Sequence, residues 1–362
     1  MQIKIEKTAL ADALAAASSV VETKTSLPVL QNVKIEVKGG KLSVTGSDLD
    51  TTIRAVAECE VIEEGAGTIP AKLFSTAVSK MVNGALSIKV DGEKITMEAG
   101  TSKFRFSGIR PEEFPVLPEV EGESITIPAT TLGEMLRKTA FAMAVDDTRR
   151  TLMGVYFTFG DGKITTVATD GRRLAIVDAE ANVPASFDKK FILPKKTVTV
   201  LRSKLAKDGD VTLALASSQA VFSFGGITLT SKLVDDAYPN YRAVVPASTQ
   251  STAVVGRNEL LGAIDRISVF VTDSSYMKLN ITGSAIGLSS SDADVGEAKD
   301  EIPVKFDGAD MEMTLNPVFV KEALNAIDED EIEVHLNDGK SPAVINPVGG
   351  GNYTYVVMPL RV

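Results

Sequence analysis

The chain repeats one pattern three times, and this repeat limits the folds that are open to it. Three segments place an aspartate just after a predicted strand: Asp48 in VTGSDLD, Asp170 in TTVATDG and Asp292 in LSSSDAD. Successive aspartates are 122 residues apart in both cases. A period of this length indicates three tandem repeats of one structural unit rather than a single large domain.

A proline next to a predicted helix recurs with nearly the same period, at Pro70, Pro194 and Pro317, with spacings of 124 and 123 residues. The fixed φ and missing N–H of proline suit the first turn of a helix. Each repeat also opens with a strand and an amphipathic helix. The apolar pairs expected on the buried faces of these first helices are Leu10 with Leu14, Leu132 with Leu136, and Leu260 with Ile264.

The predicted elements follow one order in every repeat: strand, helix, hairpin, further strand, second helix and final hairpin. This order predicts the α+β class, as three tandem copies of a unit with two helices packed on one face of antiparallel sheet. The connectors FPVLPEVEGES and YPNYRAVVPAST contain prolines that favour extended backbone. We therefore expect domains at 1–120, 121–247 and 248–362. The expected helices span 9–20, 71–81, 131–143, 194–206, 259–270 and 317–327.

The composition excludes most catalytic chemistry. The chain has one cysteine, Cys59, and one histidine, His335. Neither a CxxC zinc site nor a Ser/His/Asp or Cys/His nucleophile system can be built from these alone. The Gly339-Lys340-Ser341 triplet lacks the earlier glycine of a phosphate-binding loop. The repeated aspartates fit turn formation better than cation binding. We expect no catalytic residue, no metal and no cofactor.

No apolar run approaches the roughly 18 residues of a membrane-spanning helix, and the start of the chain, MQIKIEKTAL, is charged where a signal peptide is apolar. We expect a cytoplasmic protein with no membrane partner. The net charge is -10, from 38 basic and 48 acidic side chains. This balance opposes nucleic-acid binding unless the basic residues are clustered.

Basic residues do cluster in the second helix of the second repeat. The segment 194–206 carries Lys195, Lys196, Arg202 and Lys204 and no acidic residue. A solvated surface helix has the same pattern, and the corresponding helix of the third repeat mixes lysine with acids. The cluster alone leaves a phosphate-binding face and an ordinary solvated face both open.

Three motifs resemble one known family. The segments ATDGRRLA at 168–175, YPNY at 238–241 and YVVMPLRV at 355–362 are similar to those of the bacterial DNA polymerase III beta subunit, the DNA sliding clamp. The resemblance extends over the whole chain. It implies a head-to-tail homodimer of six units, a ring whose helices line a hole around duplex DNA. It also implies a non-catalytic processivity factor that tethers the replicative polymerase, the clamp loader and repair proteins.

The resemblance further implies three sets of functional residues. Contacts to double-stranded DNA would include Lys24, Arg150, Lys195 and Lys196. The dimer interface would pair Phe104 and Phe106 of one chain with Phe270 and Val271 of the other. An apolar pocket between the second and third repeats would bind partner peptides, with an arginine at each end to anchor a polar or carboxylate group. Its walls would be Leu152, Thr169, Gly171, Arg173, Leu174, Pro239, Val244, Phe319, Val356, Met358, Pro359 and Arg361.

The chain departs from the family at three places in this region. Arg172 stands where many members have histidine, Phe319 where many have tyrosine, and Arg150 and Thr151 where some have tyrosines. Two other functions remain open from the residues: a repeat scaffold that binds peptides but not DNA, and a hydrolase that uses two carboxylates. The second would need two inward carboxylates in one cleft.

Overall fold

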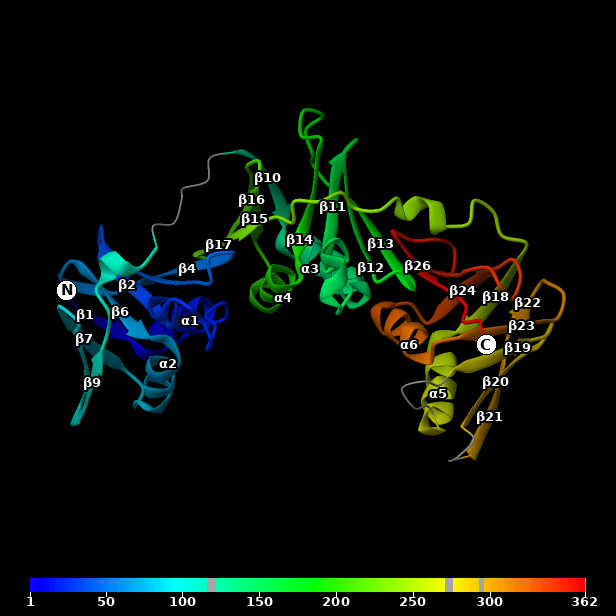
Figure 1. Ribbon diagram of the computed structural model, residues 1–362, viewed down its shortest axis with the longest axis horizontal. Coiled ribbons are helices and arrows are strands. Elements are labelled where there is room, and N and C mark those ends of the chain that lie inside the picture. Colours follow the sequence, from blue (N-terminus) through cyan, green and yellow to red (C-terminus); the bar gives the residue numbers. More distant parts are fainter. Residues whose placement is uncertain (116–121, 271–275, 293–295, 362) are drawn as a thin grey trace. The chain divides into compact units, whose positions relative to one another are not determined.

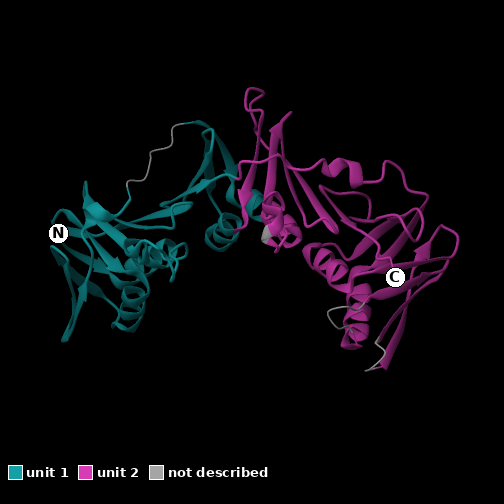
Figure 2. Ribbon diagram, viewed as in Figure 1, with its two compact units in different colours: residues 1–133, 196–233 teal, residues 134–195, 234–362 magenta. Residues whose placement is uncertain are grey.

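The computed structural model describes residues 1–115, 122–270, 276–292 and 296–361. Six α-helices and four antiparallel β-sheets occur within these ranges, which confirms the α+β class. The chain divides into two compact units, shown in Figure 2. The first unit comprises residues 1–133 and 196–233, and the second comprises 134–195 and 234–362.

All six expected helices form, two in each repeat (Figure 1). Pro70 directly precedes the second helix of the first repeat, Pro194 that of the second, and Pro317 is the first residue of that of the third. The proline period therefore marks helix starts, as predicted. The helices are α1 (Lys7–Ala17), α2 (Ala71–Lys80), α3 (Ala129–Thr139), α4 (Lys195–Lys204), α5 (Arg257–Ile267) and α6 (Pro317–Ala326).

Each first helix buries the apolar pair that its sequence predicted. Leu10 and Leu14 of α1 are 0% and 1% exposed, and Leu260 and Ile264 of α5 are 4% and 0% exposed. The α3 pair is equally buried. Helix α1 packs beside α2, and α5 beside α6. Spacing by four residues places such pairs on one helix face, which is how a short periodic signal fixes the buried side.

The first compact unit contains a five-stranded and an eight-stranded sheet. The five-stranded sheet has the order β5 (Glu60–Glu63), β1 (Gln2–Glu6), β7 (Ala85–Asp91), β8 (Lys94–Ala99) and β9 (Ser102–Ser107). The eight-stranded sheet has the order β10 (Glu123–Pro128), β15 (Asp210–Leu215), β16 (Gln219–Phe224), β17 (Ile227–Lys232), β4 (Thr51–Glu58), β3 (Lys41–Ser47), β2 (Asn32–Lys38) and β6 (Gly65–Pro70).

The second compact unit contains a nine-stranded and a four-stranded sheet. The nine-stranded sheet has the order β14 (Lys189–Pro194), β11 (Gly154–Gly160), β12 (Lys163–Thr169), β13 (Arg173–Glu180), β26 (Tyr353–Val357), β25 (Ala343–Pro347), β24 (Glu331–Leu336), β18 (Ser251–Gly256) and β22 (Lys305–Phe306). The four-stranded sheet has the order β21 (Gly296–Pro303), β20 (Ala285–Asp292), β19 (Met277–Ile281) and β23 (Met311–Leu315).

Two of these sheets continue from one repeat into the next. Strand β17 of the second repeat pairs antiparallel with β4 of the first, with Ser231 opposite Thr51. Strand β26 of the third repeat pairs in the same way with β13 of the second, with Val356 opposite Leu174. The second repeat therefore shares one sheet with each neighbour, so the compact units divide the chain through the middle of that repeat.

Tight turns whose central residues have positive φ close two of the hairpins. Gly39 and Gly40 have φ of 60° and 82°, and Asp161 and Gly162 have φ of 50° and 74°. Positive φ at both central residues matches the right-handed twist of the paired strands. Within the described ranges, no helix combines the length and apolar character needed to cross a bilayer.

Candidate functional site

The repeated aspartate forms a turn wherever its side chain is described. Asp170 Oδ1 accepts hydrogen bonds from the backbone N–H of Arg172 at 2.9 Å and of Arg173 at 3.1 Å. Asp48 Oδ1 accepts the same pair of backbone bonds in the first repeat, at 2.9 and 2.6 Å. The side chain of Asp292 lies outside the described part of the chain. The turn-forming interpretation is confirmed for the first two repeats.

Gly171 sits in the middle of the second-repeat turn with φ +85°. A Cβ at this position would lie 2.7 Å from Nη1 of Arg149, so the Arg149 guanidinium lies against the turn. Thr169 Oγ1 accepts from the Gly171 N–H at 3.0 Å and donates to the Arg173 carbonyl at 2.5 Å. Glycine therefore permits both the left-handed backbone at this position and the close approach of the Arg149 side chain.

An apolar cluster lies beside this turn, on the two strands that join the second and third repeats. Leu174 and Val356, opposite each other on β13 and β26, are 2% and 1% exposed. The rings of Tyr156 and Tyr238 stack with centroids 4.6 Å apart, and burial raises the pKa of Tyr238. The cluster comprises Val167, Leu174, Val344 and Val356, with Tyr156, Ile176, Tyr238, Tyr241 and Val245 packed against it.

A pocket of about 550 Å³ opens within the second compact unit. Its walls are the 3-10 helix η4 (Asp147–Leu152) and the segment after β17, at residues 236–239. The lining residues are Thr148, Arg149, Arg150, Thr151, Leu152, Asp236, Ala237 and Pro239. Two arginines against one aspartate give this mouth a positive balance, and both arginines are exposed.

The guanidinium of Arg173 forms ion pairs within the protein. Its Nε lies 3.1 Å from Asp170 Oδ2, and its Nη1 pairs with Glu322 of α6. The guanidinium also lies over the ring of Phe319, 4.5 Å from the centroid. With only 10% of its side chain exposed, Arg173 fixes α6 to the turn. The expectation that Arg173 and Arg361 anchor a polar or carboxylate group of a ligand stays a prediction; Arg173 is already paired within the protein, whereas Arg361 is exposed.

The other expected pocket residues lie on the same compact unit. Val244 ends the 3-10 helix η5 (Tyr241–Val244) and is 42% exposed. Met358 and Pro359 are half-buried directly after β26, and the Met358 N–H donates to the Arg172 carbonyl at 2.9 Å. Thus the turn at 169–174 and the end of β26 are held together by backbone bonds. Leu152 and Pro239 line the pocket itself.

Several residues of this region were not among the predicted pocket walls. Arg149 lines the pocket and packs on Gly171, and Tyr156 stacks on Tyr238. Tyr156 sits in the alternating strand GVYFTFG, so its face could be read from the sequence. Glu322 carries no such signal, because its pairing with Arg173 joins residues 149 positions apart.

The four expected DNA contacts have different environments. Lys24 is exposed in the segment between α1 and the 3-10 helix η1 (Pro28–Gln31), and Arg150 is exposed at the pocket mouth. Lys195 and Lys196 begin α4 and are half-buried. The ammonium of Lys196 is held by two carboxylates of the first repeat.

The two expected halves of a dimer interface lie on separate elements. Phe104 and Phe106 alternate on the edge strand β9, so they share a face, and their rings stack at 6.4 Å. Phe104 is 37% exposed, but Phe106 is 7% exposed and packs edge-on against Phe74. Phe106 therefore packs mainly within its own chain, and only Phe104 of the expected pair is exposed. Phe270 is half-buried at the end of η6 (Ser268–Phe270), and Val271 lies outside the described residues.

Acidic residues do not gather into a metal site in the described ranges, where no group of three or more histidine, cysteine or carboxylate side chains has suitable geometry. The aspartates Asp48 and Asp50, which resemble a cation-binding pair in the sequence, contact lysines instead. Asp48 pairs with Lys196, and Asp50 Oδ1 lies 2.8 Å from Nζ of Lys232. His335 lies on β24, with Nδ1 3.1 Å from Thr252 Oγ1.

Comparisons with known proteins agree with this fold. The N-terminal, central and C-terminal domains of the DNA polymerase III beta subunit match residues 1–118, 126–240 and 242–361. A beta sliding clamp of Pseudomonas aeruginosa is 31% identical over 368 residues, covering 100% of both chains. The chain belongs to the bacterial DNA polymerase III beta subunit family, the beta sliding clamps, which are non-catalytic processivity subunits.

Solved structures give the same result. A Pseudomonas aeruginosa sliding clamp bound to griselimycin matches with a TM-score of 0.97 and 30% identity over 100% of both chains. A DNA polymerase sliding clamp of Bacillus subtilis matches with a TM-score of 0.96 and 25% identity, covering 100% of this chain and 99% of that one. The chain thus has the DNA clamp fold, in three tandem domains.

Proposed function

We propose that two copies of the chain form a closed ring around duplex DNA in the cytoplasm. The ring slides without sequence specificity and tethers the replicative polymerase, the clamp loader and other proteins that carry a short binding peptide. We place the three domains at 1–120, 121–247 and 248–362, and the matched family segments support boundaries near these positions.

The observation that carries the ring is how the repeats join. At both junctions within the chain, the strand after the first hairpin of one repeat pairs with the last strand of the next, as β4 with β17 and β13 with β26. The equivalent strands left over are β21 of the third repeat and β9 of the first, and both are edge strands. Pairing β21 of one chain with β9 of another repeats the same junction.

Such a contact is head-to-tail, and two of them close a six-domain ring. Native mass spectrometry at micromolar concentration tests the dimer directly. A monomer under those conditions would remove the ring.

Enclosing the DNA in a ring would explain how a protein with a net charge of -10 stays on an anionic duplex. Binding held only by about six phosphate contacts loses roughly a thousandfold in affinity between low and moderate salt. A closed ring stays on DNA by topology, so its basic residues need only guide the duplex. Phosphate contacts also carry no sequence information, which suits sliding.

Retention on circular DNA separates this function from a peptide scaffold that never binds DNA. After loading, the ring should remain on closed circular DNA at a salt concentration that removes electrostatic binders. It should slip from linear DNA through the ends. Equal retention on both forms would remove the ring from consideration.

For the peptide, we propose the pocket lined by η4 together with the apolar residues that surround the Asp170 turn. Leu152 and Pro239 line the pocket, and we place the adaptable Met358, half-buried after β26, at its edge, where it would accept short apolar side chains of varied shape. Leu174 is 2% exposed and belongs to the apolar cluster beside the Asp170 turn, so it is not part of the pocket surface itself. Micromolar affinity, about -8 kcal/mol, would let partners exchange. Titration of a labelled partner peptide measures this affinity.

A further inference from the structure

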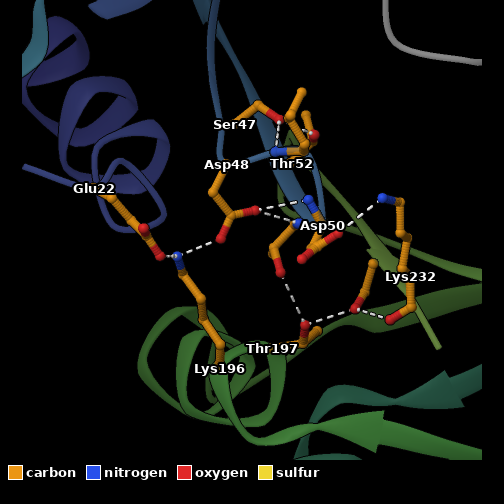
Figure 3. Close-up of polar contacts among 11 residues, drawn as sticks. Glu22, Ser47, Asp48, Asp50, Thr52, Lys196, Thr197 and Lys232 are labelled. Carbon is orange, nitrogen blue, oxygen red and sulfur yellow. Dashed lines mark hydrogen bonds and ion pairs between the residues drawn. The ribbon is translucent and has the colours of Figure 1, made fainter. Parts of the chain in front are cut away.

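The junction between the first and second repeats contains a connected polar cluster (Figure 3). Asp48 forms the turn before β4 with Oδ1 and turns Oδ2 toward Lys196 on the first turn of α4. The same ammonium lies 2.8 Å from Oε1 of Glu22, in the segment that follows α1. Lys196 therefore links three elements: α4, the Asp48 turn and the segment at 21–26.

Buried hydroxyls support this cluster from below. Thr51 Oγ1 and Thr197 Oγ1 are 3.3 Å apart, and Thr197 Oγ1 lies 2.6 Å from Ser231 Oγ. The exposed fractions of these three residues are 3%, 0% and 0%. Because the paired strands β4 and β17 carry two of them, the start of α4 cannot shift without breaking buried hydrogen bonds. The backbone of Lys196 is held firmly.

The charges of the cluster do not favour a phosphate. Three carboxylates, Glu22, Asp48 and Asp50, surround two ammonium groups, those of Lys196 and Lys232. The side chain of Lys196 is 35% exposed and that of Asp48 is 10% exposed, so their pairing is only partly screened by water. A phosphate that bound Lys196 would have to displace Glu22 and approach Asp48.

Glu22 stands two residues before Lys24, which is exposed on the same segment. Holding the Glu22 carboxylate on α4 limits where the Lys24 side chain can reach. Pre-positioning of this kind reduces the entropy lost when a charged side chain meets its ligand.

We infer that Lys196 is a positioning residue rather than a phosphate ligand: it holds the segment 21–26 so that Lys24 meets the DNA backbone. This inference rests on the proposed ring around DNA and on the DNA contact of Lys24 that the family resemblance implies.

The test compares Glu22→Gln, Lys196→Gln and Lys24→Gln in duplex binding at low salt, measured by fluorescence anisotropy. Lys24→Gln should lower the salt slope by about 0.9, as expected for one lost phosphate contact. Glu22→Gln removes a negative charge and breaks the link. If Lys196 positions Lys24, this variant weakens binding roughly two- to tenfold, within the range for coupled contacts. Lys196→Arg keeps a cation that can pair with both Glu22 and Asp48, so this variant should bind DNA as tightly as the wild type.

Two outcomes of these binding measurements would show that Lys196 is itself a phosphate ligand. Tighter binding by Glu22→Gln would mean that a freed Lys196 contacts phosphate directly. Additive losses in the Lys24→Gln/Lys196→Gln double variant would mean the same, since a positioning residue has no further effect once Lys24 is gone.

Hydrogen exchange separates this inference from the proposed DNA contact. The amides of 21–26 should exchange faster in Glu22→Gln and Lys196→Gln without DNA, and unchanged exchange would disprove the link. Wild-type binding by Lys24→Gln would refute the DNA contact of Lys24, and with it the positioning role.

Discussion

Replacing Gly171 by alanine tests how the turn beside the pocket is built. Gly171 has φ +85°, and the new Cβ would lie 2.7 Å from Nη1 of Arg149. A left-handed backbone costs a residue with a Cβ about 1–2 kcal/mol. Alanine also lowers the conformational entropy of the unfolded chain relative to glycine, which offsets about 0.4–1 kcal/mol of this cost. The Arg149 side chain can move aside, since the close atom is the far end of a flexible chain. We expect a net loss of about 1 kcal/mol.

The loss should appear in the second compact unit. For a unit of roughly 190 residues, about 1 kcal/mol lowers the unfolding temperature by about 2–4 °C in calorimetry. If the carboxylate of a partner peptide contacts Arg149, moving this side chain should also weaken peptide binding about fivefold, the equivalent of about 1 kcal/mol for an exposed charge contact. Anisotropy with a labelled peptide measures the second effect.

The first repeat supplies a matched control. Leu49 occupies the equivalent turn position with φ +78° and is 45% exposed. Leu49→Gly relieves the same backbone strain, partly offset by about 0.5–1 kcal/mol of glycine entropy. Its unfolding temperature should therefore be equal to or above that of the wild type. If Gly171→Ala is as stable as the wild type while Leu49→Gly is less stable, the backbone argument is wrong.

Three further predictions concern the pocket, the dimer and pH. Met358→Ala should weaken peptide binding about tenfold with the unfolding temperature unchanged, and an unaltered affinity would place the site elsewhere. Phe104→Ala should raise the dimer dissociation constant about tenfold in native mass spectrometry, and a wild-type dimer would exclude β9 from the interface. Burial raises the pKa of Asp328, but Lys138 and Arg137 outweigh it and lower the pKa. The ion pairs of Asp328 stabilise the fold at pH values above the unfolded pKa, near 3.9, and this stabilisation is lost as the pH falls through the lower folded pKa. For such a half-exposed group the contribution is about 0.5 kcal/mol after solvent screening. Asp328→Asn should reduce the fall in unfolding temperature at acid pH, and an unchanged pH profile would contradict this.

The sequence by itself determined the three repeats, the six helices and the turns. These features depend on local chemistry that repeats along the chain. A proline starts a helix, an aspartate bonds to the backbone two and three residues ahead, and an apolar pair four residues apart selects a helix face. Such signals can be read without knowing which distant residues lie nearby. The motifs at 168–175 and 355–362 also indicated the DNA polymerase III beta subunit family.

Only the tertiary structure decided which strands became neighbours and which charges were already paired. Alternation along a strand tells which face is buried, but not that β17 joins β4 or that β26 joins β13. Lys196 is a free cation in the sequence, and carboxylates 148 and 174 positions away hold it in the fold. Phe106 was expected at a dimer interface, and within the chain it packs against Phe74 of α2. Contacts of this kind depend on distances that chain folding sets, because Coulomb and packing forces act between neighbours in space.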